Sequence, residues 1–249
     1  MHFITQRLKK YFENAFWLIF EKGFTLAVGM VVGIYVARYL QPESFGLLNY
    51  AISFVSIFSA FSALGLEQII VRELAKGTGR RDDLLGTGFI LKLAGSVVLI
   101  VLMMVILVFM DHNAFTNTLV LIIAAAEIFK GFEVINYFFQ SQVQSKYVIQ
   151  IQLLINLLLS FTKLGLVFIH APLIWFAVII VIGSILNAIG FIYAYRKREG
   201  TPWSWSFQKP LAFELLRESW PLALYGIALH IQARIDQVML GKMLNNYEV

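Results

Sequence analysis

Long apolar runs dominate the chain, and short polar connections separate them. Seven runs are long enough to cross the hydrocarbon core of a bilayer, which takes about 20 residues of helix. The runs do not alternate between apolar and polar positions as the strands of a membrane β-barrel would, and residues 97–110 are apolar throughout. The pattern predicts an all-α, polytopic membrane helical bundle with about seven transmembrane helices. We place the spans near residues 14–38, 44–65, 84–110, 116–140, 148–169, 172–195 and 219–243.

Two connections have features of their own. Residues 66–76 place apolar side chains at helical spacing with charges between them, which predicts a helix lying in the membrane interface. Residues 196–218 form the longest break and contain a basic cluster and two prolines. We interpret this segment as a cytoplasmic linker, which divides the chain into a six-helix transmembrane lobe (1–195), the linker (196–218) and a further helix (219–249).

Composition supports a membrane protein. Hydrophobic residues make up 59% of the 249 and charged residues 14%, with a mean hydropathy of +0.75; soluble domains average about 25% charged residues. A soluble core of this size could not bury so many apolar side chains, which excludes a soluble enzyme, a disordered chain and a nucleic-acid-binding module. The net charge of +5 does not indicate nucleic acid as a partner, because the basic residues lie between apolar runs and form no stripe. No cysteine is present, so thiol and disulfide chemistry are excluded.

The basic residues predict the orientation. If the N-terminus is cytoplasmic, the inside connections hold thirteen Lys and Arg residues and the outside connections hold two, Arg38 and Lys242. Such a bias orients membrane proteins, so we expect a cytoplasmic N-terminus. The thirteen inside residues are Arg7, Lys9, Lys10, Arg72, Lys76, Arg80, Arg81, Lys146, Arg196, Lys197, Arg198, Lys209 and Arg217.

Polar side chains also follow one face of each predicted span. Serine and glycine stripes of this kind favour helix packing, and Gly29 and Gly33 form a GxxxG pair that permits close helix approach. Ionisable side chains need another explanation, because each costs about 2.5–3.5 kcal/mol at a helix centre. The nine inside predicted spans are Glu21, Lys22, Lys92, Glu127, Lys130, Glu133, Lys163, Arg234 and Asp236.

Left unsatisfied, nine such charges would cost roughly 20–30 kcal/mol, more than a typical folding free energy of about 5–15 kcal/mol. They must therefore pair, face water, or snorkel, the last being an alternative for the three lysines nearest the membrane faces. Glu127, Lys130 and Glu133 lie a turn apart in mid-helix and can pair along that helix. We expect them to face a water-filled interior. The nine charges sum to +1, a slight preference for anions.

The sequence contains no pattern typical of an enzyme site. The four histidines are scattered, so we expect no metal site and no cofactor. Residues 77–79 (Gly-Thr-Gly) lack the spacing of a phosphate-binding loop, and no Ser-His-Asp or Cys-His arrangement appears. The residues alone indicate a transporter with a hydrated interior of mixed charge.

Four segments carry a resemblance to a known family. They are YVARYLQPESFGLLNY (35–50), LGLEQIIVRELAK (64–76), DDLLGTGFILKL (82–93) and ESWPLALYGIALHIQARIDQVMLGKML (218–244). In this order they resemble the Wzx-type polysaccharide and O-antigen flippases of the multidrug/oligosaccharidyl-lipid/polysaccharide exporter superfamily.

The resemblance implies a function and an architecture. Members flip oligosaccharides linked to undecaprenyl diphosphate, such as O-antigen or exopolysaccharide repeat units, across the bacterial inner membrane by alternating access. The expected partners are the lipid-linked oligosaccharide, the lipid bilayer, and polysaccharide polymerase and export proteins. Members have twelve or more helices in two lobes. The chain would therefore hold the first lobe and the first helix of an incomplete second lobe, as a fragment or truncated product.

The resemblance also suggests roles for the buried charges. Cations in a cavity would bind the phosphates or sugars of the substrate, and carboxylates would pair those cations or couple transport to protons or sodium ions. Only Arg234 and Asp236 fall inside the most specific motif. The candidate substrate contacts are Lys22, Lys92, Lys130, Lys163 and Arg234, and the candidate coupling or pairing residues are Glu21, Glu127, Glu133 and Asp236.

Three alternatives remain open at this point. One is a drug/cation antiporter of the same superfamily. Another is a membrane-embedded polysaccharide enzyme such as an O-antigen polymerase or acyltransferase, which we disfavour because the outside connections near residues 38–43, 111–116 and 170–172 are too short for a glycan-binding domain. The last is an inactive remnant.

Overall fold

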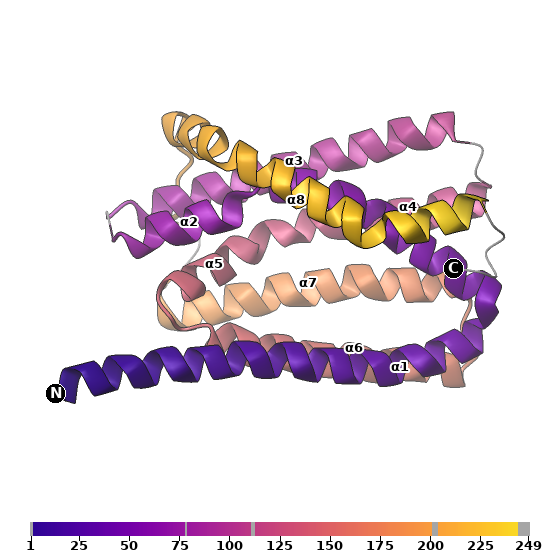
Figure 1. Cartoon of the computed structure of the whole chain (residues 1–249), viewed down its shortest axis with the longest axis horizontal. Coiled ribbons are helices and arrows are strands. Elements are labelled where there is room, and N and C mark those ends of the chain that lie inside the picture. Colours follow the sequence, from indigo (N-terminus) through magenta and orange to yellow (C-terminus); the bar gives the residue numbers. More distant parts are fainter. Residues whose placement is uncertain (1, 78, 111–112, 201–203, 244–249) are drawn as a thin grey trace.

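The computed structural model describes residues 2–77, 79–110, 113–200 and 204–243, and for residues 2–11, 60, 61, 230, 236–238 and 240–243 it describes the backbone alone. These residues form an all-helical bundle with no strand among them (Figure 1). The expected fold class, a helical membrane bundle, is confirmed. The elements are α1 (His2–Ala63), α2 (Leu66–Ala75), α3 (Arg81–Phe109), α4 (Ala114–Ala125), η1 (Ala126–Glu133), α5 (Val134–Ser141), α6 (Lys146–Phe168), α7 (Leu173–Arg198) and α8 (Lys209–Met243).

Helix α1 contains the first two predicted spans. It breaks at Gln41, whose φ of 62° and ψ of 163° are not helical, and Pro42 follows. Proline disfavours a helical residue before it and supplies no backbone N–H. The Gln41 side chain steadies the turn by donating a hydrogen bond to the carbonyl of Arg38 (3.0 Å). The chain then runs back toward its starting end, so one continuous ribbon supplies two segments of the bundle (Figure 1).

By length and hydropathy, four helices in the described part could cross a membrane. These are Phe12–Ser59, Arg81–Phe109, Lys146–Phe168 and Leu173–Arg198, the first of which includes the break at Gln41. The predicted fourth and seventh spans are helical but are not among them. The seventh lies within α8, which starts at Lys209, ten residues before the predicted span.

The predicted fourth span is not one regular helix. Ala126–Glu133 is a 3₁₀ helix between α4 and α5, so the span does not keep α-helical geometry over this segment. A 3₁₀ helix has three residues per turn and places side chains i and i+3 directly above one another. Glu127, Lys130 and Glu133 follow that spacing, and the tighter turn aligns all three on one side.

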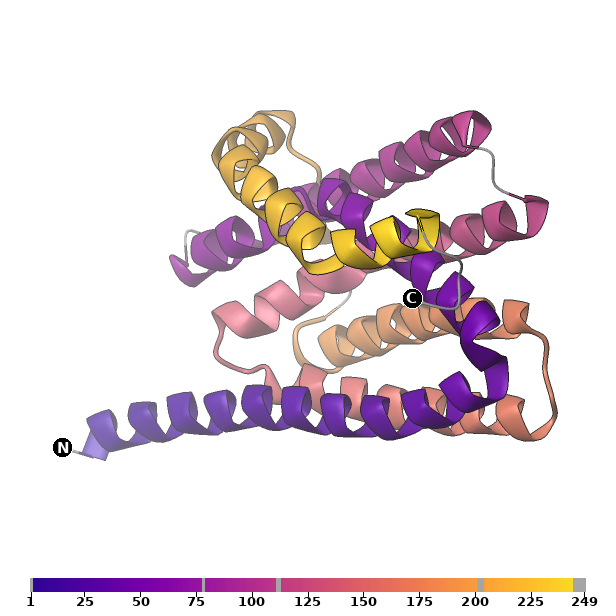
Figure 2. The ribbon, with the colours of Figure 1, turned by 45° about the vertical axis from the view of Figure 1, so that its right-hand side comes forward.

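The connections alternate between two ends of the bundle. The start of α1, the α2–α3 and α5–α6 connections and the end of α7 lie at one end, and the α1 break and the α6–α7 connection lie at the other (Figures 1 and 2). We call the first the basic end, because it carries most of the cations assigned to the inside connections. Those whose side chains the structure describes are Arg72, Lys76, Arg80, Arg81, Lys146, Arg196, Lys197, Arg198, Lys209 and Arg217.

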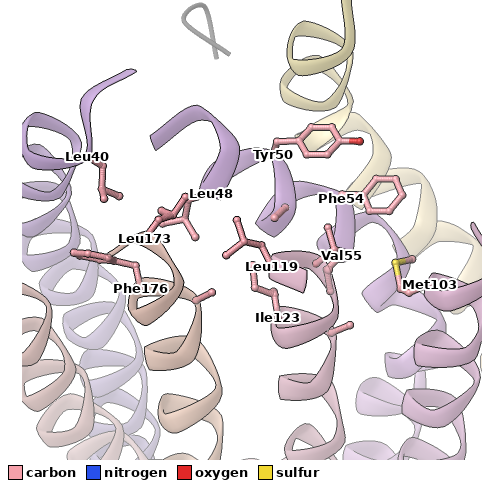
Figure 3. Close-up of a cluster of buried hydrophobic side chains, with 14 of the residues drawn as sticks. Leu40, Leu48, Tyr50, Phe54, Val55, Met103, Leu119, Ile123, Leu173 and Phe176 are labelled. Carbon is pink, nitrogen blue, oxygen red and sulfur yellow. The ribbon is translucent and has the colours of Figure 1, made fainter. Parts of the chain in front are cut away.

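The largest buried cluster lies nearer the opposite end (Figure 3). Side chains on both sides of the α1 break, among them Leu40, Leu48 and Tyr50, pack there with residues of α3, α4 and α7. Tyr39 adds a polar contact, since its hydroxyl donates to the carbonyl of Ala171 (2.9 Å). Tyr39, which lies just before the α1 break, therefore holds the start of α7 against α1.

The segment between α7 and α8 is docked on the basic end. The backbone N–H of Ser206 donates to the carbonyl of Asp82 (3.3 Å), and the backbone N–H of Gln208 donates to the hydroxyl of Thr87 (3.1 Å). A Cβ on Gly86 would lie 2.4 Å from the Ser206 carbonyl oxygen, so only glycine permits this approach. The predicted linker thus lies on the start of α3.

Helix α8 crosses the chain at Gly65, between α1 and α2. Gly65 has a φ of +63°, and a Cβ there would lie 2.6 Å from the backbone nitrogen of Ala223 and 2.8 Å from the carbonyl oxygen of Ser219. The GxxxG pair is different: a Cβ at Gly29 or Gly33 would meet nothing within 4 Å. The pair permits a close helix approach, but no helix among the described residues makes one there.

We predict that Gly65→Ala lowers the free energy of unfolding by about 2–4 kcal/mol, because alanine is disfavoured at positive φ by roughly 1–2 kcal/mol and overpacking adds about 1–3 kcal/mol. Denaturant unfolding of the purified protein in detergent micelles measures this. Gly29→Ala is the matched control and should be neutral or stabilising by up to about 1 kcal/mol. Equal effects of the two substitutions would contradict the proposed crossing of α8.

Candidate functional site

A polar cavity of about 190 Å³ lies between α1, η1, α6 and α7. Its walls combine three ionisable side chains, three amides, one hydroxyl and two aromatic rings. The lining residues are Glu21, Phe129, Lys130, Glu133, Gln152, Asn156, Ser184, Asn187 and Phe191.

Behind one wall, Lys92 of α3 is almost completely buried, with 2% of its side chain exposed. Its Nζ donates to Glu133 Oε2 (2.5 Å) and to the Tyr137 hydroxyl (2.8 Å). Glu133 keeps 36% of its side chain exposed and lines the cavity. The pair therefore connects a buried cation to a carboxylate that water can reach, which meets the need of a buried charge for a partner.

A second ion pair runs along η1. Lys130 Nζ donates to Glu127 Oε1 (2.6 Å), with 41% of the Lys130 side chain and 6% of the Glu127 side chain exposed. Ser96 connects the two pairs through the backbone, because its hydroxyl lies 2.9 Å from the carbonyl oxygens of both Lys92 and Glu127. The predicted pairing along the helix holds for Glu127 and Lys130, whereas Glu133 pairs across to α3.

The facing wall comes from α1 and α6. The Thr25 hydroxyl donates to Glu21 Oε1 (3.4 Å), and the Asn156 amide donates to the Thr25 hydroxyl (3.3 Å). On α7, the Asn187 amide donates to the carbonyl of Gly183 (2.8 Å), which leaves its amide oxygen for the cavity. These hydrogen bonds hold the side chains of Glu21, Asn156 and Asn187 in the cavity lining.

Five of the nine predicted site residues therefore gather here. Glu21, Lys130 and Glu133 line the cavity, and Lys92 and Glu127 lie one contact behind it. Lys22, Lys163 and Arg234 are not among the lining residues, and Lys22 is exposed on the bundle surface. The side chain of Asp236 lies outside the described residues.

The gathered charges change the expected preference of the site. Two cations and three carboxylates give this cluster a net charge of −1, whereas all nine predicted residues sum to +1. The difference arises because three of the cations lie elsewhere. A cluster of this sign does not favour an anion, so its chemistry suits hydroxyl groups, cations or protons.

Sequence reasoning missed several residues of the site. Tyr137 had no assigned role, although its hydroxyl accepts a hydrogen bond from Lys92. Ser184, Phe129 and Phe191 were also unassigned. The three-residue spacing of Glu127, Lys130 and Glu133 fits an α-helix as well as a 3₁₀ helix, so it gave no separate signal of the 3₁₀ turn.

Three of the four family-like segments, 64–76, 82–93 and 218–244, meet at the basic end rather than in the cavity. Arg72 of the second segment pairs with Glu218 of the fourth and also with Glu73 (2.9 Å). Lys76 donates to Glu73 (2.7 Å) and thereby lowers the pKa of that carboxyl group. Asp83 of the third segment accepts a hydrogen bond from Ser206. These contacts tie α2, α3 and α8 together.

A helical bundle with four helices apolar enough to cross a membrane and an ion-paired polar cavity between its helices is typical of a polytopic membrane protein. Residues 11–249 match the family described as polysaccharide biosynthesis protein. The chain therefore belongs to this family, and its bundle and cavity are consistent with a polysaccharide-related membrane transporter. Neither the curated proteins nor the solved structures compared with the chain gave a significant match.

We predict that Glu133→Gln lowers the free energy of unfolding by about 3 kcal/mol, because it leaves the Lys92 ammonium buried without its counter-charge. Adding Lys92→Met should recover most of that loss, since it removes the stranded charge. Denaturant unfolding in detergent micelles of the two single variants and the double variant measures the coupling.

Glu21→Gln is the matched control, because Glu21 lines the same cavity and, among the described residues, has only the Thr25 hydroxyl as its partner. We expect a change below about 1 kcal/mol. Strictly additive effects of the Lys92 and Glu133 substitutions would show that the pair does not hold this wall together.

Proposed function

We propose that the chain is part of a transporter, not an enzyme, that flips undecaprenyl-diphosphate-linked oligosaccharide across the bacterial inner membrane by alternating access. The N-terminus and the basic end would face the cytoplasm. Its partners would be the lipid-linked oligosaccharide, the bilayer, and polysaccharide polymerase and export proteins. Family membership and the apolar spans support this reading.

The observation that carries the proposal is the polar lining of the cavity between spans. Gln152, Asn156 and Asn187 offer amide donors and acceptors, and Ser184 offers a hydroxyl group. Amides can bond both the hydrogen and the oxygen of a sugar hydroxyl. Sugars suit this lining better than an aromatic, apolar drug would, because few of its walls are apolar.

The net negative charge of the cavity cluster disfavours binding of the diphosphate in this cavity. Lys130 is the cation that lines the described cavity, and Glu127 already neutralises it. We therefore assign the cavity to the sugar portion. Arg234 of α8, which lies in the most specific family-like segment, is our candidate for the diphosphate.

The carboxylates supply a means of coupling. Glu21 and Glu133 line the same cavity, and Glu133 also accepts a hydrogen bond from the buried Lys92. Binding a proton or sodium ion at Glu133 would weaken its attraction for Lys92. A transported cation would in this way change the interaction between α3 and η1.

The test uses the complete reading frame expressed in a bacterial strain that lacks its own flippase. We predict that the unaltered protein restores surface polysaccharide and that Lys130→Gln lowers export at least about tenfold, the equivalent of one charge-assisted hydrogen bond of roughly 1.5–3 kcal/mol. Lys209→Gln, the same change on the exposed start of α8, should export normally. Quantitative immunoblotting of surface glycan gives the measurement.

Two results would contradict the proposal. Wild-type export by Lys130→Gln would remove the cavity from the transport path. Efflux of a cationic dye without any restored glycan would assign the protein to drug/cation antiport instead.

A further inference from the structure

A second cavity, of about 430 Å³, lies between α3, η1, α7 and the docked segment that precedes α8. It is separate from the polar cavity and differs from it in chemistry. Most of its walls are aromatic or aliphatic, and its volume falls in the range of about 300–1,000 Å³ that is typical of ligand sites. The lining residues are Gly86, Phe89, Ile90, Phe132, Ile192, Arg196, Trp205 and Phe207.

The walls of this apolar cavity are held in place by ring contacts. Trp205 packs against Phe89 (5.9 Å between ring centroids) and against Tyr195 (5.6 Å), and its indole N–H donates to the Tyr195 hydroxyl (3.3 Å). Phe89 also contacts Phe132 (4.9 Å). Ile90 and Phe207 are exposed, so the cavity opens on the outside of the bundle. It is a preformed hollow that faces the surroundings of the protein.

One cation stands at this cavity. Three basic residues end α7, and two of them lie over aromatic rings: Arg198 over Tyr147 (3.7 Å) and Lys197 over Tyr193 (5.8 Å). Arg196 lines the cavity and makes no hydrogen bond, ion pair or ring contact with the part of the chain that the structure describes.

The acidic groups nearby already have partners. Arg81 pairs with Asp82 (3.2 Å) and with Glu199 (2.9 Å), and Asp83 accepts from Ser206. Arg196 is therefore left for an anion from outside the chain. An apolar hollow with a single guanidinium group matches a molecule that joins a hydrocarbon chain to a phosphate.

We propose that this cavity binds an anionic phospholipid, with one acyl chain against the aromatic walls and the phosphate on Arg196. Arg196 lies in the last turn of α7, a helix that is apolar enough to cross a membrane. This position places Arg196 near the lipid headgroups of the leaflet at the basic end. Basic pockets between spans and interfacial tryptophans are typical of such lipid sites. The proposal rests on membrane insertion and does not require transport.

The test uses the quenching of Trp205 fluorescence by brominated lipid. A variant that keeps Trp205 and carries phenylalanine at positions 17, 175, 203 and 220 is reconstituted in phosphatidylcholine vesicles. Phosphatidylglycerol or phosphatidylcholine brominated near the carboxyl end of its acyl chains is then added in rising mole fraction. We expect phosphatidylglycerol to reach half-maximal quenching at a mole fraction about fivefold lower, the effect of roughly one membrane-proximal cation.

Arg196→Gln in the same background should abolish this difference, whereas Arg198→Gln, an identical change outside the cavity, should retain it. Circular dichroism verifies that both variants are folded. In Arg196→Gln, contact of the brominated acyl chain with the aromatic walls should still quench Trp205. Equal quenching by the two lipids in the unsubstituted background, or a preference that survives Arg196→Gln, would overturn the proposal. Displacement of phosphatidylglycerol by equimolar undecaprenyl phosphate would also overturn it, by assigning the cavity to the transported lipid.

Discussion

The contact between Lys92 and Glu133 is the interaction on which the interior of this bundle depends. A charge in hydrocarbon must find a counter-charge or water, and this pair uses both: the lysine is buried and the carboxylate reaches the cavity. The Tyr137 hydroxyl accepts a second hydrogen bond from the ammonium group of Lys92. Ser96 connects the pair to Glu127 and Lys130 through backbone carbonyls. Without the pair, α3 would present an unpaired cation to η1, and the polar cavity would lose one wall.

Family likeness and cavity chemistry occupy different parts of the molecule. The four family-like segments form the α1 turn, α2, the start of α3 and α8, where they fix turns and dock elements. None of the residues that line the polar cavity falls within these segments, although Lys92 lies just behind it. The segments therefore contribute to the scaffold of the bundle, whereas the polar cavity is lined by side chains of α1, η1, α6 and α7.

The apolar runs predicted the helices well, because backbone N–H and C=O groups have no water to bond in lipid and a helix satisfies them within its own segment. The α2 helix and the pairing of Glu127 with Lys130 also followed from spacing. Three features did not. The 3₁₀ turn is contacted by the Ser96 hydroxyl at the Glu127 carbonyl. The docking of residues 204–208 requires glycine at position 86, on a different helix. No helix of the described chain closely approaches the GxxxG pair, so small residues permit a close approach without causing one. Each is a tertiary effect that no local pattern encodes.

The most direct measurement of the central claim, a water-accessible cavity inside the apolar bundle, is single-cysteine labelling. The chain has no cysteine of its own, so each introduced thiol reports alone. Asn156 lines the cavity, and Leu158, two residues along α6, is exposed on the bundle surface. A membrane-impermeant, water-soluble maleimide should label Asn156→Cys and spare Leu158→Cys, and a lipid-phase thiol probe should do the reverse. Protection of Asn156→Cys from the water-soluble reagent, together with labelling by the lipid-phase probe, would contradict a hydrated cavity.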